Sequence, residues 1–437
     1  MKRRDFLKFF GIGLSAAIAG SVGLSRPVRG DETSYLYLPA VFNMTPGGWY
    51  DITIPDGVFS WVPFVVQGNG AEFRPHPDFS LQEHANITVN KTYYVDSENG
   101  DDGNSGADWD NAFETLNEAW SQADVDRIYA TGQWTNNQQH SITTRDFELI
   151  GVGDCTVTCD VTDEFVGAWS SVDNHYEAAV SDYVYTMRDE SDPDANCPEW
   201  GTDLDTKASI AEVDANPGSF WQDWPSRKIY VRTHDSREPD TDLRSYKNLA
   251  IYFARDNQTV YLENIKLFTG TYWRSDDVGG LKVYAKNCQF YKGLFYGLDE
   301  VIFEDCSNHC YKEGDVMDYN DRDGVTGYGI EINCDFRNIS EDGPNQASTA
   351  HDGSNIVRIE GYYETGIQTI ADSAETIWML GVHANNFNDG WAFYSEQEAW
   401  LDRCYLDGEL VDQDTGGTIY IRDCTITGAQ SGNIQSY

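Results

Sequence analysis

The chain has 437 residues, of which 40% are hydrophobic and 14% aromatic, and its formal net charge is −42 at pH 7. This share of apolar residues excludes a disordered polymer, and the negative charge excludes nucleic acid, which it would repel, as a partner. An acidic surface of this kind is typical of a halophile, because the Debye length falls to about 3 Å in 1 M salt.

Residues 1–30 are predicted to be an export signal rather than part of the fold. The pair Arg3-Arg4 precedes a short and mildly apolar run, Phe9 to Leu24. That run is too short and weakly apolar to span a membrane. The opening letters KRRDFLK resemble a twin-arginine signal peptide. The resemblance implies export of a folded chain, hence a secreted or cell-surface protein with no stable membrane span after signal removal.

Residues 31–92 contain apolar stretches such as YLYLPAVF and WVPFVVQG, which predict a small N-terminal β region of unassigned role. A strand, a loop rich in Gly and Asp, and a short amphipathic helix are expected next. The helix is predicted from one apolar stripe at helical spacing, formed by Phe113, Leu116, Trp120 and Ala123. A helix here would cover the open end of an apolar column.

Eight segments in the second half of the chain repeat one pattern. The pattern is absent at about 160–248, where a β-rich insertion is expected. Aligned at one corner position, the repeats are spaced 18 to 28 residues apart at Ile265, Cys288, Cys306, Cys334, Gly361, Gly381, Cys404 and Cys424. Apolar residues alternate with polar ones before a polar corner. This pattern predicts a solenoid of stacked strands, in which each coil buries its neighbour's apolar face.

The capping helix and the repeats together resemble right-handed parallel β-helix proteins of the pectate-lyase-like superfamily. The resemblance implies an all-β fold, with a parallel β-helix over 93–437, an N-terminal capping helix and the β-rich insertion. It also implies a carbohydrate-active protein with a polysaccharide substrate. The catalytic motifs of polygalacturonases are not reproduced in this sequence, so no catalytic residue is transferred from the family.

The two longest repeat spacings place loops at 310–327 and 340–352, and loops on a rigid scaffold often carry function. Asp352 and Asp372 each lie nine residues before an aligned glycine. We therefore expect them on neighbouring coils, about 4.8 Å apart, as a pair of catalytic carboxylates. Asp323 is an alternative partner, and His351 is a candidate base. The competing interpretation is a solvated corner or a calcium site.

Alternation in three middle repeats predicts that Glu331, Arg358 and Trp378 face outward in one column. An acid, a cation and an indole in a row suit sugar binding. Lys312 is a second candidate cation for a uronate substrate. The alternative is a surface salt bridge between Glu331 and Arg358 beside an ordinary exposed Trp. His383 is expected to be an interior residue.

Asp315, Asp318 and Asp321 offer the oxygen ligands that Ca²⁺ prefers, although their spacing lacks a full calcium-loop pattern. Calcium is therefore a candidate cofactor.

Two classes of function remain open from the sequence. One is an exported enzyme, either a polysaccharide lyase or a glycoside hydrolase, that cleaves its substrate on the side of the β-helix. The other is a non-catalytic extracellular glycan-binding or adhesin-like β-helix protein.

Overall fold

The computed structural model describes residues 48–53, 59–135, 145–158, 162–181, 183–192, 201–247, 257–268, 271–274, 280–290, 293–296, 298–311, 318–319, 327–338, 347–350, 354–365, 370–372, 374–386, 390–395, 397–413 and 417–437. All of them belong to one compact unit, Asn43–Tyr437.

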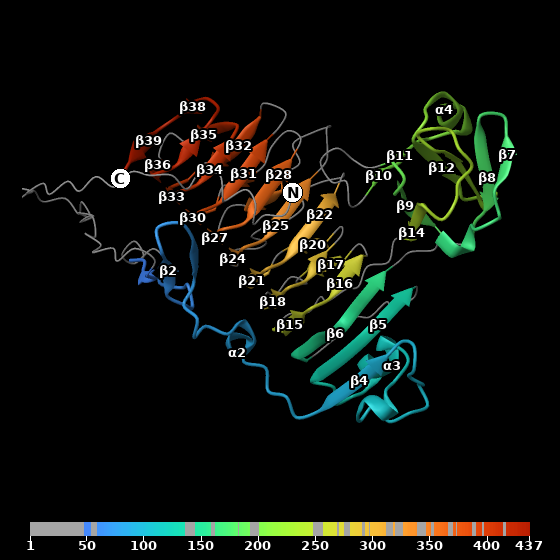
Figure 1. Cartoon of the computed structure of the whole chain (residues 1–437), viewed down its shortest axis with the longest axis horizontal. Coiled ribbons are helices and arrows are strands. Elements are labelled where there is room, and N and C mark those ends of the chain that lie inside the picture. Colours follow the sequence, from blue (N-terminus) through green and yellow to red (C-terminus); the bar gives the residue numbers. More distant parts are fainter. Residues whose placement is uncertain are drawn as a thin grey trace, which may run out of the picture. The chain divides into compact units, whose positions relative to one another are not determined.

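The second half of the chain is a solenoid of parallel strands, which confirms the predicted all-β class (Figure 1). Each coil contributes one strand to each of two long parallel sheets. The first sheet contains β15 (Thr259–Glu263), β18 (Lys282–Lys286), β21 (Glu300–Glu304), β24 (Tyr328–Ile332), β27 (Asn355–Ile359), β30 (Thr376–Leu380), β33 (Ala399–Asp402), β36 (Ile419–Arg422) and β39 (Ile434–Ser436). The second sheet contains β16 (Lys266–Phe268), β19 (Gln289–Phe290), β22 (Ser307–Tyr311), β25 (Asp335–Asn338), β28 (Tyr362–Thr365), β31 (His383–Asn386), β34 (Tyr405–Asp407) and β37 (Thr425–Ile426).

A third parallel sheet closes the later coils. It contains β23 (Asp318–Tyr319), β26 (Ser348–Ala350), β29 (Ile370–Asp372), β32 (Trp391–Ser395), β35 (Glu409–Asp412) and β38 (Gln430–Ser431). In the earlier coils, β17 (Thr271–Arg274) pairs with β20 (Gly293–Tyr296). The stack begins with β4 (Thr92–Asp96), β5 (Arg127–Thr135) and β6 (Phe147–Thr158), and β6 pairs with both β15 and β16.

Each coil passes from the first to the second sheet through one residue in the left-handed backbone region. These corner residues have φ between 50° and 65° and are Asn264, Asn287, Asp305, Asn333, Glu360, Gly381, Arg403 and Asp423. Asn and Asp tolerate this conformation better than most residues, which explains the polar corner of the repeat. The Asn287 side-chain amide donates to the Asn264 amide oxygen at 2.6 Å, so neighbouring corners are also tied together.

The register corrects the sequence alignment in one coil. Leu380 lies opposite Asp402, and His383 lies opposite Tyr362, so the residue that corresponds to Cys404 is Val382. Gly381 is instead the left-handed corner of that coil. The sequence alignment was one residue out there because a glycine also stands at the aligned position of the coil before, Gly361.

The solenoid interior is a continuous apolar column that runs from the N-terminal cap to the last coils. The cap includes α3 (Leu116–Ser121) after the 3₁₀ turn η1 (Trp109–Asn111), and the Thr115 hydroxyl accepts the Glu118 N–H at 3.2 Å as its N-cap. Leu116 and Trp120 are buried as predicted. The helix is shorter than the predicted stripe, because Phe113 forms a bridge to Val95 and Ala123 is exposed.

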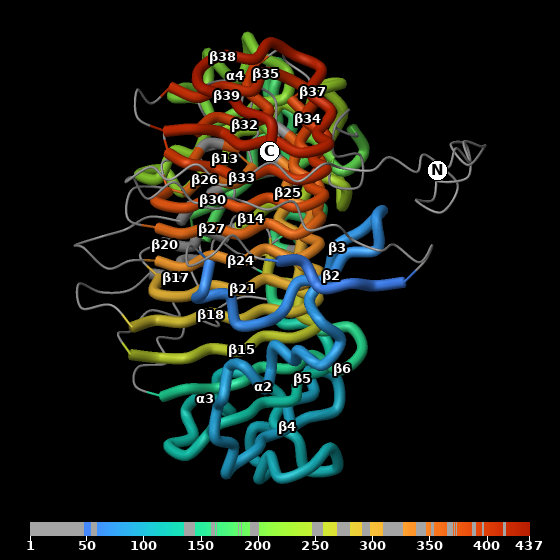
Figure 2. Tube along the Cα trace, turned by 90° about the vertical axis from the view of Figure 1, so that its left-hand side faces the viewer, coloured from blue at the N-terminus to red at the C-terminus, as the bar shows by residue number. Residues whose placement is uncertain are grey.

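The N-terminal segment, defined here as the described residues of 48–90, packs on the outer face of the first sheet (Figure 2). It contains β1 (Tyr50–Asp51), β2 (Val66–Gly68), β3 (Phe73–Pro75) and α2 (Leu81–Ala85). The Phe59 ring lies 5.2 Å from Trp378 and 5.5 Å from Trp400, measured between ring centroids. This segment therefore shares a hydrophobic core with the solenoid.

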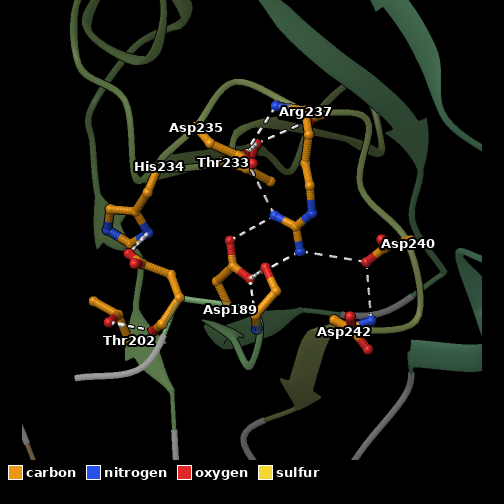
Figure 3. A network of polar contacts seen from close by, with 10 residues as sticks. Asp189, Thr202, Thr233, His234, Asp235, Arg237, Asp240 and Asp242 are labelled. Carbon is orange, nitrogen blue, oxygen red and sulfur yellow. Dashed lines mark hydrogen bonds and ion pairs between the residues drawn. The ribbon is translucent and has the colours of Figure 1, made fainter. Parts of the chain in front are cut away.

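The predicted β-rich insertion is present and has its own hydrophobic core. It contains η2 (Thr162–Glu164), β7 (Ser170–Val172), β8 (His175–Ala179), β9 (Val184–Asp189), β10 (Thr202–Asp203), β11 (Asp205–Thr206), α4 (Ile210–Ala215), β12 (Ser219–Asp223), β13 (Lys228–Arg232) and β14 (Leu243–Lys247). Figure 3 shows a polar network within it, in which the Arg237 guanidinium donates to both oxygens of the buried Asp189 at 2.7 and 2.8 Å. Burial opposes ionisation of Asp189, but the hydrogen bonds from Arg237 and Ser191 outweigh it and lower the pKa. This network fastens the loop after β13 to the end of β9.

Candidate active site on the outer face of the second sheet

Most of the predicted loop residues lie outside the described part of the chain. These are His351, Asp352, Asp323, Lys312, Asp315 and Asp321. Of the three predicted calcium ligands only Asp318 is placed, at the start of β23, where its backbone pairs with Thr349. The catalytic, cation and calcium roles of these residues therefore stay predictions.

The predicted outward column of Glu331, Arg358 and Trp378 is wrong. Glu331 lies beside Arg358 and Arg358 beside Met379, and both charged side chains point into the solenoid with no solvent exposure. Trp378 does point outward, but it lies opposite Val357 and is 2% exposed because the N-terminal segment covers it. The sequence misled because apolar residues line both faces of the first sheet, so they do not mark the interior.

Asp372 also faces the interior and joins Glu331 and Arg358 in a buried network. The Arg358 guanidinium donates to the two Asp372 carboxylate oxygens at 2.7 and 3.0 Å, and to Glu331 at 3.2 Å. The Ser348 hydroxyl donates to Glu331 at 2.9 Å and accepts from Arg358 at 2.9 Å. The in-register neighbour of Asp372 is Ala350, two residues before the predicted partner Asp352, and the misaligned glycine accounts for one of these two residues.

The surroundings of this network shift the pKa values of its groups. Burial opposes the charge of Arg358, but the Asp372 and Glu331 carboxylates outweigh it and raise the pKa. Burial and the adjacent Glu331 raise the pKa of the Tyr363 hydroxyl, which donates to that carboxylate. A fully buried network cannot contact a polymer, so it stabilises the solenoid from within.

The outer face of the second sheet carries a set of exposed and half-buried polar and aromatic side chains. Side chains alternate along each strand, and Phe336, Tyr363, Ala384 and Leu406 take the inward positions. Two outward columns result. The first, called here the aromatic column, is Tyr362, His383 and Tyr405. The second, called here the acid column, is Arg337, Glu364, Asn385 and Asp407.

The aromatic column is a ladder of rings. The His383 ring centroid lies 5.0 Å from that of Tyr362 and 4.6 Å from that of Tyr405, in edge-on arrangements. His383 is exposed, and Tyr405 is 39% exposed. The prediction that His383 is interior was wrong, because Ala384 occupies that position after the one-residue shift. The column thus presents the exposed rings of His383 and Tyr405 beside the half-buried ring of Tyr362, and apolar ring surface of this kind can pack against the apolar face of a sugar.

Glu364, from β28, is the half-buried carboxylic acid of the acid column. The Asn385 amide donates to its Oε1 at 3.3 Å and to the Tyr362 hydroxyl at 3.4 Å. Burial raises the pKa of Glu364, and hydrogen bonds from Tyr362 and Asn385 together with the charge of Arg337 offset this only in part. Burial also raises the pKa of Tyr362 to about 12. The raised pKa makes Glu364 a candidate proton donor.

Two further carboxylates flank Glu364. Asp407 stands in the same column two strands along, which separates the two Cα atoms by about 9–10 Å. The Thr427 hydroxyl donates to Asp407 at 2.5 Å. Asp335 lies beside Tyr362 and receives two hydrogen bonds from Arg337, both 2.8 Å long. The local charge is thus three carboxyl groups against one guanidinium.

Of the predicted site residues that the structure describes, Glu331, Arg358, Asp372, Trp378 and Asp318, none lies on this face. A signal was present in the repeats DFR, YYE, HAN and YLD, each of which has one inward residue between two polar or aromatic ones. The sequence does not single out these strands, because they follow the same repeat as the rest of the sheet and only the insertions depart from it.

No group of three or more His, Cys, Asp or Glu side chains among the described residues is arranged to hold a metal ion. No helix in this part of the chain has the length and hydropathy needed to cross a membrane.

No protein-family model matches the sequence, and no curated protein matches it. The fold is similar to a solved structure of XylC in complex with xylose, with a TM-score of 0.52 and 10% identity over 77% of this chain and 70% of that chain. A structure described as a glycoside hydrolase has a TM-score of 0.46 and 10% identity over 79% of this chain and 96% of that chain. The likeness to XylC shows that the two chains share a fold.

Proposed function

We propose that the protein is a carbohydrate-active enzyme that hydrolyses a polysaccharide bound along the outer face of the second sheet. The observation that carries the proposal is the aromatic column beside the acid column. A ladder of two exposed rings and one half-buried ring can pack against sugar units, and the adjacent carboxyl groups can act on the bond between them. The fold shared with XylC is compatible with this reaction class.

A neutral glycan is the substrate class that fits the charges. The described carboxyl groups of the site outnumber its one cation, and Arg337 already donates two hydrogen bonds to Asp335. A uronate polymer would be repelled by this site and by the net charge of −42. Because the XylC structure contains xylose, xylan is the first polysaccharide to test.

The assigned mechanism uses Glu364 as general acid and Asp407 as general base. Glu364 transfers its proton to the glycosidic oxygen as the bond to the anomeric carbon breaks. Asp407 takes a proton from the water that attacks this carbon from the opposite face. The two Cα atoms lie about 9–10 Å apart, and an inverting mechanism requires the two carboxyl groups to lie roughly 6.5–9.5 Å apart, with a water molecule between them.

A lyase is less well supported. It needs a cation to neutralise the substrate carboxylate and a base to remove the adjacent proton, and the charge of Arg337 is already balanced by Asp335. A non-catalytic binding protein would need only the aromatic column, so it remains the second candidate. The raised pKa of Glu364 favours an enzyme, because shifted pKa values gather at catalytic sites.

The test is the release of reducing ends from xylan and a panel of other neutral polysaccharides by the exported form of the chain. Glu364→Gln and Asp407→Asn should each lower the rate by about 10²–10⁴-fold, the usual contribution of an acid or base. Glu98→Gln, an exposed glutamate in the N-terminal cap, is the matched control and should keep the full rate.

Three other outcomes would contradict the proposal. Full activity of both variants, with loss in Asp352→Asn, would move the site to the loops. Unsaturated uronate products would indicate a lyase. Retention on the polysaccharide without any product would indicate a binding protein.

Export by the twin-arginine route and calcium binding are further parts of the proposed function. Replacing Arg3 and Arg4 by Lys should keep the folded protein inside the producing cell, and unchanged secretion would reject this route. Removing calcium with a chelator should lower activity if Asp315, Asp318 and Asp321 hold the ion. Equal activity with and without the chelator would reject the cofactor.

A further inference from the structure

A polar pocket opens at the N-terminal end of the second sheet, over the strands that precede the acid column. It encloses about 360 Å³ and is lined by side chains that include Asp154, Asn264, Lys266, Asn287, Gln289 and Ser307. These groups supply amides, a hydroxyl, an ammonium and a carboxylate. Such a mixture of donors and acceptors matches the hydroxyl groups of a sugar, and the other charged residue of the lining is Asp305.

The end wall of the pocket is a bulge in β6. Between its pairings with β15 and β16, β6 uses five residues, 151–155, where the next coil uses only Asn264 and Ile265. The bulge carries Asp154, whose carboxylate accepts from Gln133 at 3.0 Å and from Lys266 at 3.1 Å. Gly151 is required here, because a Cβ atom would lie 2.2 Å from the Asn264 carbonyl oxygen.

The pocket and the aromatic column belong to one row of side chains. In register, Lys266 lies opposite Gln289, Gln289 opposite Ser307, and Ser307 opposite Asp335. Asp335 then lies opposite Tyr362, which begins the aromatic column. Successive members are about 4.8 Å apart, so Ser307 lies roughly 10 Å before Tyr362. A polysaccharide chain that follows this row from the aromatic column passes over the pocket.

We propose that this pocket is a distal subsite that binds the hydroxyl groups of a neutral polysaccharide several sugar units from the point of cleavage. The inference rests on the proposed function for the face of cleavage. It adds that the enzyme selects long chains, because only these reach Gln289 and Ser307 while a bond lies at the acid column. Binding energy gained there lowers KM for long substrates and does not enter kcat.

The test compares short and long oligosaccharides in the double variant Gln289→Ala/Ser307→Ala. Loss of two hydrogen bonds at about 1 kcal/mol each should raise KM for xylohexaose by roughly 10–30-fold. The kcat for xylohexaose and both constants for xylotriose should not change. The matched double variant Asn99→Ala/Ser121→Ala, in the N-terminal cap, should behave as the parent protein. Equal effects on both substrates, or no effect on either, would overturn the subsite.

A binding measurement separates this proposal from that of the enzyme. Titration calorimetry with xylohexaose and cellohexaose in the Glu364→Gln background needs no catalysis. Weaker binding of a hexasaccharide in the added Gln289→Ala/Ser307→Ala variant would support the subsite even if no substrate is cleaved. If Glu364→Gln abolishes cleavage but the pocket variant binds as tightly as its parent, the enzyme stands and the subsite fails. Absence of binding of both hexasaccharides would also overturn the subsite.

Discussion

The outer faces of the first and second sheets differ although the same coils build both. On the first sheet, outward side chains such as Tyr284, Trp378 and Trp400 are buried beneath the N-terminal segment. On the second sheet, the equivalent outward positions include the exposed His383 and Tyr405. The repeat therefore determines which side chains line the interior of the solenoid, but not which outer face is exposed to solvent. What covers a face decides whether its aromatic residues stabilise the fold or remain available to a ligand.

The same contrast separates the two groups of carboxylates. Asp372 and Glu331 are fully buried and both form ion pairs with Arg358, so their charges are balanced inside the solenoid. Glu364 and Asp407 lie on the outer face of the second sheet, where water and substrate can reach them. The proposed mechanism uses the second group because a general acid must touch the bond it protonates.

The largest effect is expected from breaking the buried network of Arg358, Asp372 and Glu331. Arg358→Ala leaves two carboxylates buried without their cation, and should lower the free energy of unfolding by about 3–5 kcal/mol. Denaturant unfolding measures this loss. Lys286→Ala, which removes the partly exposed partner of Glu304, should cost less than about 1 kcal/mol. Similar small losses in both variants would show that the inner network does not stabilise the coil.

A somewhat smaller effect is expected from exposing the outer face of the first sheet to solvent. Phe59→Ala removes a fully buried ring between Trp378 and Trp400, and should cost about 3 kcal/mol in unfolding free energy. The tryptophan fluorescence should shift to longer wavelength as water reaches both indoles. Val65→Ala, at an exposed position of the same segment, should change stability by less than about 0.5 kcal/mol. An unchanged spectrum in Phe59→Ala would contradict the covering role of the segment.

The smallest effect sharpens the assignment of Glu364. Its pKa is raised by burial, and the acid must hold its proton, so kcat/KM should fall about tenfold per pH unit above that pKa. The Arg337 charge lowers this pKa and the Asp335 charge raises it. Arg337→Ala should therefore move the alkaline limb of the pH–rate profile to higher pH, and Asp335→Asn should move it to lower pH. Shifts in the same direction would exclude Glu364 as the titrating acid.

The sequence predicted the architecture because each coil repeats the same local requirements. An alternating strand, a left-handed polar corner and an inward residue such as Cys334 recur often enough to reveal a solenoid. The insertion and the capping helix were also located correctly. The one alignment error, at Gly381, arose because a glycine can be either a corner or an aligned residue. That single shift misplaced His383 and accounts for one of the two residues by which the predicted partner of Asp372 was wrong.

The sequence by itself therefore determined the stacked coils, their approximate boundaries and the apolar column inside them, since these depend on short-range alternation and spacing. Only the tertiary structure decided which way Glu331 and Arg358 point, which face the N-terminal segment covers, and which carboxyl groups meet on the outside. Alternation of apolar and polar residues identifies the buried face of a sheet only when the other face is exposed to solvent. Whether a face is wet depends on segments hundreds of residues apart, such as Phe59 and Trp378.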